Sequence, residues 1–161
     1  MAFFSKRNDK LRNGSLLNTS LDLALFSFAE CPIGSPIERY RELEFMIGNK
    51  ESYENAKLGF EFGVKAGKLN YVFVDLNIFN QLYHNGESVD LSGATIQQVN
   101  ALMGKEIWKD EDEDEIILFY EFDEIEIQFE FPDKQKLEII TITNEGLLKD
   151  PQQRKFYGID S

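Results

Sequence analysis

The sequence contains few residues of the types that carry out catalysis. His84 is the only histidine, and it precedes Asn85-Gly86, a pair typical of an exposed turn. Cys31 is the only cysteine, and no adjacent basic residue would activate its thiol. The chain has no glycine-rich phosphate loop, no nucleophile elbow and no Cys/His metal spacing. We therefore expect a protein that is not an enzyme, with Cys31 buried as a small apolar group.

An acidic run at 110–121, DEDEDEIILFYE, contains carboxylates at a spacing that could bind calcium. Four of them match positions one, three, five and twelve of an EF-hand loop: Asp110, Asp112, Asp114 and Glu121. However, Glu115 occupies the position at which that loop needs glycine, and 116–122 has the pattern of a strand, not of the exiting helix. We expect a solvated loop, kept extended by charge repulsion, and no metal or other cofactor; calcium binding remains an alternative.

The clearest pattern is the alternation of side chains along the predicted strand 124–131. One face is apolar: Ile125, Ile127, Phe129 and Phe131. The other face is acidic or polar: Glu124, Glu126, Gln128 and Glu130. Such a face can be an ordinary wetted surface that keeps the protein soluble. It can also be a landing surface for a basic protein, because clustered charge speeds association and selects partners by sign.

We predict that this acidic face binds the partner. The expected contact residues lie on this strand, on its two neighbouring strands and at the matching place in the first half of the chain: Glu124, Glu126, Gln128, Glu130, Glu138, Phe119, Glu61 and Tyr71. Glu121 can join them from the strand that contains Phe119. Because helices cannot cover these carboxylates without burying unpaired charge, we expect them all to stay open to water, and replacing Glu126 and Glu130 by lysine should leave folding nearly intact.

The elements that would position these side chains occur twice. Phe-Glu-Phe at 60–62 and at 129–131 is followed in both cases by Lys-Leu. Before each meander, a predicted helix repeats one spacing of glycine and apolar residues: Gly34, Ile37, Tyr40 and Leu43, then Gly93, Ile96, Val99 and Leu102. Capping boxes are predicted to begin both helices, at Ser35-Pro36-Ile37-Glu38 and at Thr95 with Gln98.

The predicted fold is α+β, with two tandem units of helix and antiparallel meander whose helices pack on one face of the sheet and leave the other face open. An earlier segment, LLNTSLDLALFSFAE, favours a helix by the spacing of Leu17, Leu21, Leu25 and Phe28, although Leu21, Leu23 and Leu25 would also suit a strand. The expected divisions are a basic arm, a first unit, a linker or hairpin, a second unit and a tail: 1–14, 15–82, 83–92, 93–148 and 149–161.

Composition restricts the class of partner. The chain has 161 residues, 42% of them apolar, and a net charge of −12, which would repel nucleic acids and anionic membranes. No apolar stretch is long enough to span a bilayer, and the N-terminus lacks the pattern of a signal peptide. We expect a cytoplasmic protein that binds a basic protein, with neither nucleic acid nor membrane as partner.

The order of glycine, helix, glycine, polar loop, aromatic strand and Lys-Leu strand is similar to the repeat of β-lactamase inhibitor protein-like and small outer-membrane lipoprotein A domains. It also resembles small bacterial cytoplasmic proteins, some of which act as immunity proteins. The lipoprotein group's signal and lipid-attachment cysteine are absent here, as is the usual proline after Gly48. The resemblance implies the repeat fold and a protein-binding role; a small-ligand or calcium-binding protein and a structural subunit of a complex are the alternatives.

Overall fold

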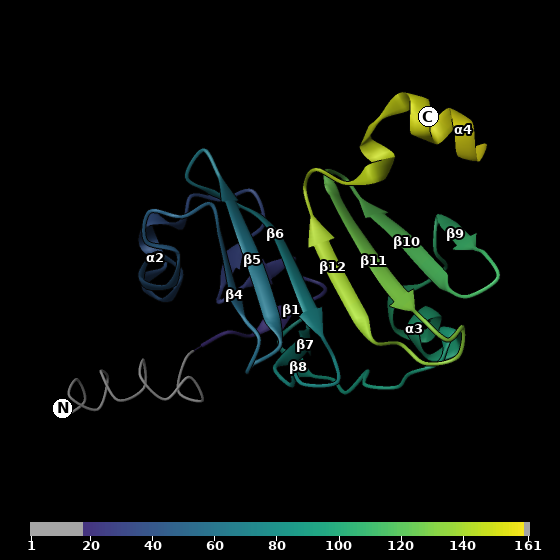
Figure 1. Ribbon diagram of the computed structural model, residues 1–161, viewed down its shortest axis with the longest axis horizontal. Helices are drawn as coiled ribbons and strands as arrows, with labels where there is room; N and C mark the ends of the chain where they lie inside the picture. Colours follow the sequence, from purple (N-terminus) through teal and green to yellow (C-terminus); the bar gives the residue numbers. More distant parts are fainter. Residues whose placement is uncertain (1–17, 160–161) are drawn as a thin grey trace.

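The computed structural model describes residues 18–159, and its larger sheet has seven strands, all antiparallel to their neighbours. Across the sheet the order is β4 (Ser52–Asn55), β5 (Phe60–Lys65), β6 (Lys68–Asp75), β12 (Ile139–Thr143), β11 (Ile125–Phe131), β10 (Ile116–Phe122) and β9 (Trp108–Glu111). The two meanders join where β6 pairs with β12 (Figure 1). The α+β class predicted from the sequence is confirmed.

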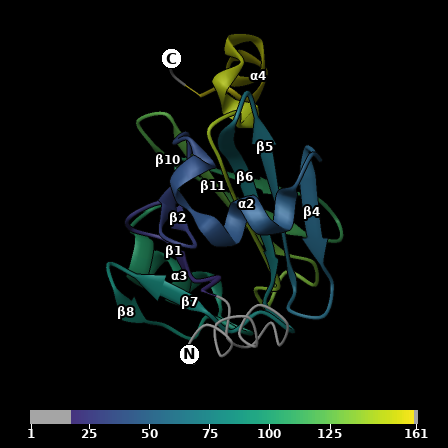
Figure 2. The ribbon, with the colours of Figure 1, turned by 90° about the vertical axis from the view of Figure 1, so that its left-hand side faces the viewer.

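A smaller sheet and a layer of short helices lie behind the larger sheet (Figures 1 and 2). The small sheet has the order β3 (Cys31–Pro32), β2 (Ser27–Phe28), β1 (Leu21–Asp22), β7 (Leu82–His84) and β8 (Glu87–Ser88). The helices on this side are η1 (Ile37–Arg39) followed by α2 (Arg41–Ile47), and α3 (Ile96–Met103). A short turn η2 (Leu147–Lys149) and the helix α4 (Pro151–Tyr157) follow the last strand.

The core fills the space between the large sheet and this layer. Phe60 and Phe62 on β5 point into it beside Phe28 of β2, with ring centroids 5.2 and 5.7 Å apart. In the second half, Phe129 lies edge-on to Tyr120, and the Tyr120 hydroxyl donates to the backbone oxygen of Gly104 just after α3. Period-two alternation explains this arrangement, since each strand turns its apolar side chains to the helices.

The helix predicted within residues 16–30 is wrong over the described part, which begins at residue 18; Leu17 lies outside it. Instead, β1 and β2 form a tight hairpin, and Leu25 is 55% exposed while Leu21 and Leu23 are buried. The buried Asp22 carboxylate accepts the N–H groups of Ala24 and Leu25, which closes the turn, and also those of Asn85 and Gly86 in the β7–β8 turn. Local hydrogen bonding by aspartate competes with helix formation in this way.

The helix predicted to begin at Ser35 begins later. Gly34 N–H donates to Leu69 O and Leu69 N–H to Ser35 O, so the segment is held like a strand against the β5–β6 hairpin. Only the short η1 follows, without a side-chain cap, and α2 begins at Arg41. The second cap is confirmed: Thr95 and Gln98 exchange the two hydrogen bonds of a capping box.

Four segments outside the predicted helices and meanders contain regular structure. The polar loop after α2 contains the edge strand β4, and the acidic run begins inside β9, where Asp110 pairs with Ile117. The tail predicted from residue 149 contains α4. The segment at 83–92 does close a hairpin, β7–β8, because Asn85 and Gly86 both take the positive φ angles that such a turn requires.

Candidate protein-binding face

The side of the large sheet opposite α2 and α3 is here called the open face, and its side chains form three rows across the strands. The upper row is Ser52, Gly63, Tyr71, Thr143, Glu126 and Glu121. The middle row is Glu54, Glu61, Phe73, Thr141, Gln128, Phe119 and Trp108. The lower row is Asp75, Ile139, Glu130, Ile117 and Asp110.

In the first half of the open face, a tyrosine lies flat across the neighbouring strand. A Cβ atom at Gly63 would be 2.1 Å from the Tyr71 ring, so only glycine leaves room for it. The Tyr71 hydroxyl donates to Glu61, and burial together with this carboxylate raises the pKa of Tyr71 to about 12. Glu54 lies directly opposite Glu61 on the edge strand, a like-charge pair that costs stability in a sheet.

In the second half, the chain covers its own acidic strand. Glu126 is 4% exposed, and its carboxylate accepts the N–H groups of Leu147 (3.1 Å) and Leu148 (2.9 Å) and the side-chain amide of Gln128 (2.7 Å). A Cβ atom at Gly146 would lie 2.3 Å from the Glu126 carboxyl carbon, so glycine permits this approach. Backbone donors thus replace the water that the carboxylate loses.

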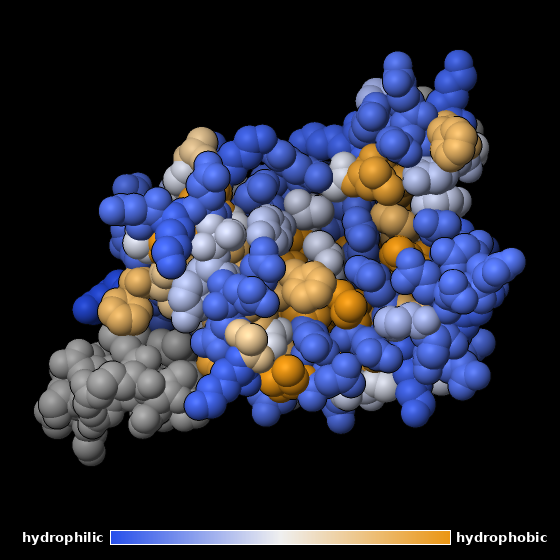
Figure 3. Space-filling view, in the orientation of Figure 1, coloured by the Kyte–Doolittle hydropathy of each residue, from blue (hydrophilic) through white to orange (hydrophobic). Residues whose placement is uncertain are grey.

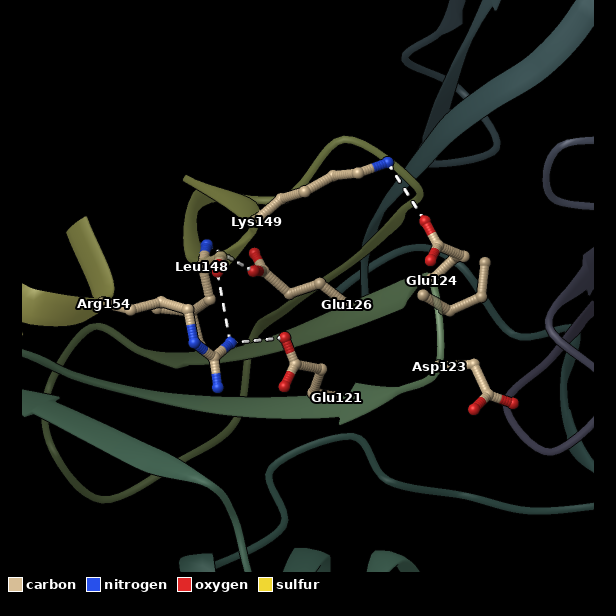
Figure 4. A pocket seen from close by; sticks show the side chains of 9 residues that line it. Glu121, Asp123, Glu124, Glu126, Leu148, Lys149 and Arg154 are labelled. Carbon is tan, nitrogen blue, oxygen red and sulfur yellow. Dashed lines mark hydrogen bonds and ion pairs between the residues drawn. The ribbon is translucent and has the colours of Figure 1, made fainter. Parts of the chain in front are cut away.

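Beyond Glu126, two cations of the C-terminal segment (residues 146–157) form ion pairs with two further carboxylates (Figure 4). Arg154 Nη1 is 2.7 Å from Glu121 Oε2, and Lys149 Nζ is 3.3 Å from Glu124 Oε2. Arg154 also donates to the backbone oxygen of Leu148. The Lys149 pair is exposed and contributes little, whereas the Arg154 pair is largely shielded from water.

The aromatic residues at this corner form a stack. The indole of Trp108 lies 5.1 Å from the Phe119 ring and 3.8 Å from the ring of Tyr157 on α4, measured between centroids. Phe119 is consequently 2% exposed. A separate pocket remains between the C-terminal segment and the β10–β11 turn (Figure 4). Its charged lining residues are Glu121, Asp123, Glu124, Glu126, Lys149 and Arg154.

The predicted contact residues therefore divide into three groups. Four lie half-buried or exposed on the open face: Glu61, Tyr71, Gln128 and Glu130. The expectation of open carboxylates is wrong for Glu126, and Phe119 is also covered, because the C-terminal segment lies over both. Glu124 is exposed just before β11, and Glu138 is out of register: Ile139 lies opposite Glu130, while Glu138 accepts a hydrogen bond from Asn77.

Sequence reasoning missed Phe73, Ile139 and Trp108 on the open face and the role of Arg154. The alternation along β6 and β12 could have placed Phe73 and Ile139 there. Glu130 lies between Ile139 and Ile117, and burial, with repulsion from Glu115, raises the pKa of its carboxyl above the ordinary value. A carboxylate held partly out of water in this way gains from an added cationic partner.

The acidic run, Cys31 and His84 are the other residues considered for metal binding or catalysis. Asp112 accepts the N–H groups of Glu115 and Asp114, which lowers the pKa of its carboxyl and folds the run into a turn. Among residues 18–159 no three His, Cys, Asp or Glu side chains gather in a way that could hold a metal ion. Cys31 is buried, and burial raises the pKa of its thiol to about 11. His84 ends β7, opposite Glu87.

Comparisons with known proteins give the fold alone. No protein-family model matches the chain, and no curated protein matches it. The DUF4309 family protein YjgB of Bacillus subtilis is 16% identical, with a TM-score of 0.39 over 60% of this chain and 66% of that one. An extracellular protein of Bacillus anthracis that contains an SCP domain is 11% identical, with a TM-score of 0.50 over 76% of this chain and 52% of that one, about half its length. In the described part of the chain, no helix has the length and apolar character needed to cross a membrane.

Proposed function

We propose that the chain is a non-enzymatic protein-binding module whose open face receives a basic protein. The observation that carries this proposal is the combination of apolar and acidic side chains on the part of the sheet made by β5, β6 and β12. Within residues 18–159, no helix covers this part (Figures 1 and 2). The resemblance to the β-lactamase inhibitor protein-like repeat, whose members bind proteins, agrees with this function.

The chemistry of the face suits a protein interface. Apolar surface gathers over the middle of the sheet, surrounded by hydrophilic residues (Figure 3). Phe73, Tyr71 and Ile139 are half-buried members of the open-face rows there. Aromatic anchors inside a polar rim are typical of protein interfaces.

The charge of the face favours a basic partner. Glu54 and Glu61 face each other across strands, and Glu130 lies between two isoleucines. Lysine or arginine side chains from a partner would reduce the repulsion between Glu54 and Glu61 and offset the desolvation of Glu130. The net charge of −12 would also steer a basic protein toward the surface. The finer form of the proposal is a cytoplasmic immunity protein that masks a basic toxin surface. A toxin-like reading frame immediately upstream of its gene is the genetic arrangement that this form expects.

The test uses two double charge reversals of equal size. Glu61→Lys with Glu130→Lys changes the open face, whereas Glu44→Lys with Glu87→Lys changes exposed residues of α2 and β8. Each immobilised protein is used to retrieve partners from a lysate of the cells that encode it. We expect a basic protein that the wild type and the α2/β8 variant retain and that the open-face variant binds at least about tenfold more weakly.

Salt provides a second comparison on the retrieved protein. Wild-type affinity should fall as salt rises, and the open-face variant should lose much of this dependence. Equal retention by all three proteins, or loss only with the α2/β8 variant, would place the interface elsewhere. Circular dichroism of each variant verifies that the fold is intact.

A further inference from the structure

The C-terminal segment, defined as Gly146–Tyr157, occupies one corner of the open face by contacts of two different strengths. Near its start, Leu148 is fully buried and the backbone of Leu147 and Leu148 is bonded to Glu126. Farther along, α4 has no buried residue and meets the sheet mainly through Arg154 and Tyr157. The segment is thus anchored at η2 and more loosely held at α4.

The helix α4 depends on this docking. It has seven residues, and isolated helices shorter than about 12 residues are marginal in water. Its N-cap, Asp150, accepts the N–H of Gln152, and Gly158 ends it in the left-handed conformation. One shielded ion pair and one aromatic stack are modest contributions, so α4 belongs among the elements that can open without global unfolding.

The contacts of α4 are those that a basic partner would make. Arg154 reaches Glu121 in the upper row of the open face, and Tyr157 stacks on Trp108 at the end of the middle row. These rows continue into the uncovered part at β12 and β6. The corner and the proposed docking surface therefore belong to one continuous face.

We propose that α4 is an internal occupant of this corner, and that a partner segment presenting an arginine and an aromatic side chain three residues apart on a helix replaces it. This inference rests on the proposed function and names the partner's chemistry. Because α4 is tethered to the sheet, its effective concentration is on the order of millimolar, so a partner must compete with it. The docked helix therefore lowers the apparent affinity of a partner for this corner, so only a partner of higher intrinsic affinity replaces it.

The single tryptophan of the chain makes the exchange measurable. Trp108 reports the stack with Tyr157, and a peptide of residues 150–159, DPQQRKFYGI, adds no tryptophan of its own. The full-length variant Arg154→Ala with Tyr157→Ala removes both side-chain contacts and keeps the hydrogen bonds from the Leu147 and Leu148 N–H groups to Glu126. We expect its Trp108 emission to differ from the wild type, with an unchanged far-ultraviolet spectrum apart from the loss of α4.

Peptide titration then tests replacement. When the peptide is added to the double variant, Trp108 emission should return toward that of the wild type. The affinity of the peptide for the double variant should be at least about tenfold higher than for the wild type, in which α4 competes. A matched peptide with glutamate in place of the arginine should fail to bind. Each single variant, Arg154→Ala and Tyr157→Ala, repeats the measurement with a smaller change.

Identical Trp108 emission in the wild type and all variants would overturn the inference, because α4 would then not be docked in solution. Equal affinity of the peptide for wild type and double variant, or binding of the glutamate peptide, would also overturn it. Neither result affects the retrieval experiment, which depends on Glu61 and Glu130. Conversely, the open-face variant could retain the basic protein as well as the wild type does. That result would refute the proposed function even if peptide exchange at the corner still occurred.

Discussion

Replacing Glu126 by alanine is expected to lower the free energy of unfolding by about 2–3 kcal/mol and to release the C-terminal segment. The substitution leaves the N–H groups of Leu147 and Leu148 without their acceptor, at a place where Leu148 is fully buried. Urea unfolding followed by circular dichroism measures the loss of stability. Trp108 emission measures the release, because α4 follows directly after η2.

The control is Glu124→Ala, two residues earlier and exposed, which should cost less than about 0.5 kcal/mol. Gly146→Ala should disrupt the same contact by steric overlap. The φ of −73° at this residue suits alanine, but the new Cβ atom would overlap the Glu126 carboxyl group. It should release the segment as Glu126→Ala does. If Glu126→Ala is no more destabilising than Glu124→Ala, the segment is not held through this carboxylate.

Replacing Asp22 by alanine is expected to cost about 3 kcal/mol. The Asp22 carboxylate accepts four backbone N–H groups, from Ala24, Leu25, Asn85 and Gly86, at 2.8–2.9 Å. It thereby joins the β1–β2 turn to the β7–β8 turn within the small sheet. Thermal unfolding of the variant, beside an Asp90→Ala control at an exposed residue, measures the effect.

The stability due to Asp22 should also depend on pH. Burial alone would raise the pKa of its carboxyl, but the four N–H donors outweigh burial and the pKa lies below the ordinary value. A depressed folded-state pKa means that the contribution is complete above the unfolded-state pKa, about 3.9, and is lost as pH falls through the folded value. The difference between wild type and Asp22→Ala should therefore shrink below about pH 4; a difference that stays constant down to pH 2 would contradict this.

Local patterns predicted most of the large sheet. Alternation at Phe60 and Phe62, the capping box at Thr95 and the Asn85-Gly86 turn each depend on residues near one another in sequence, and all three are found. The segment around Leu21 was predicted wrongly because two signals competed there. The strand is favoured over the helix by the hydrogen bonds that Asp22 accepts from Asn85 and Gly86, about 60 residues away. No local period can reveal such contacts.

The same limit applies to the site. Alternation correctly placed Glu126, Gln128 and Glu130 on one face, but it could not show that residues 147 and 148 would cover Glu126. Glu138 was misplaced because the chain leaves the regular period just before β12: Leu137 is buried in the core, and Ile139 takes the place opposite Glu130. A cluster of basic and aromatic residues near the end of an acidic chain was the available signal for the covering segment.

Carboxylate footprinting of the complex tests the central claim most directly. Exposed carboxylates are coupled to glycine ethyl ester with a carbodiimide, in the free protein and with the retrieved basic partner bound, and the labelled residues are quantified by mass spectrometry. If the open face is the docking surface, labelling of Glu54, Glu61 and Glu130 should fall several-fold in the complex, while Glu44 on α2 and Glu87 on β8 stay as reactive as before. Unchanged labelling of the three open-face residues, with protection of Glu44 or Glu87, would contradict it.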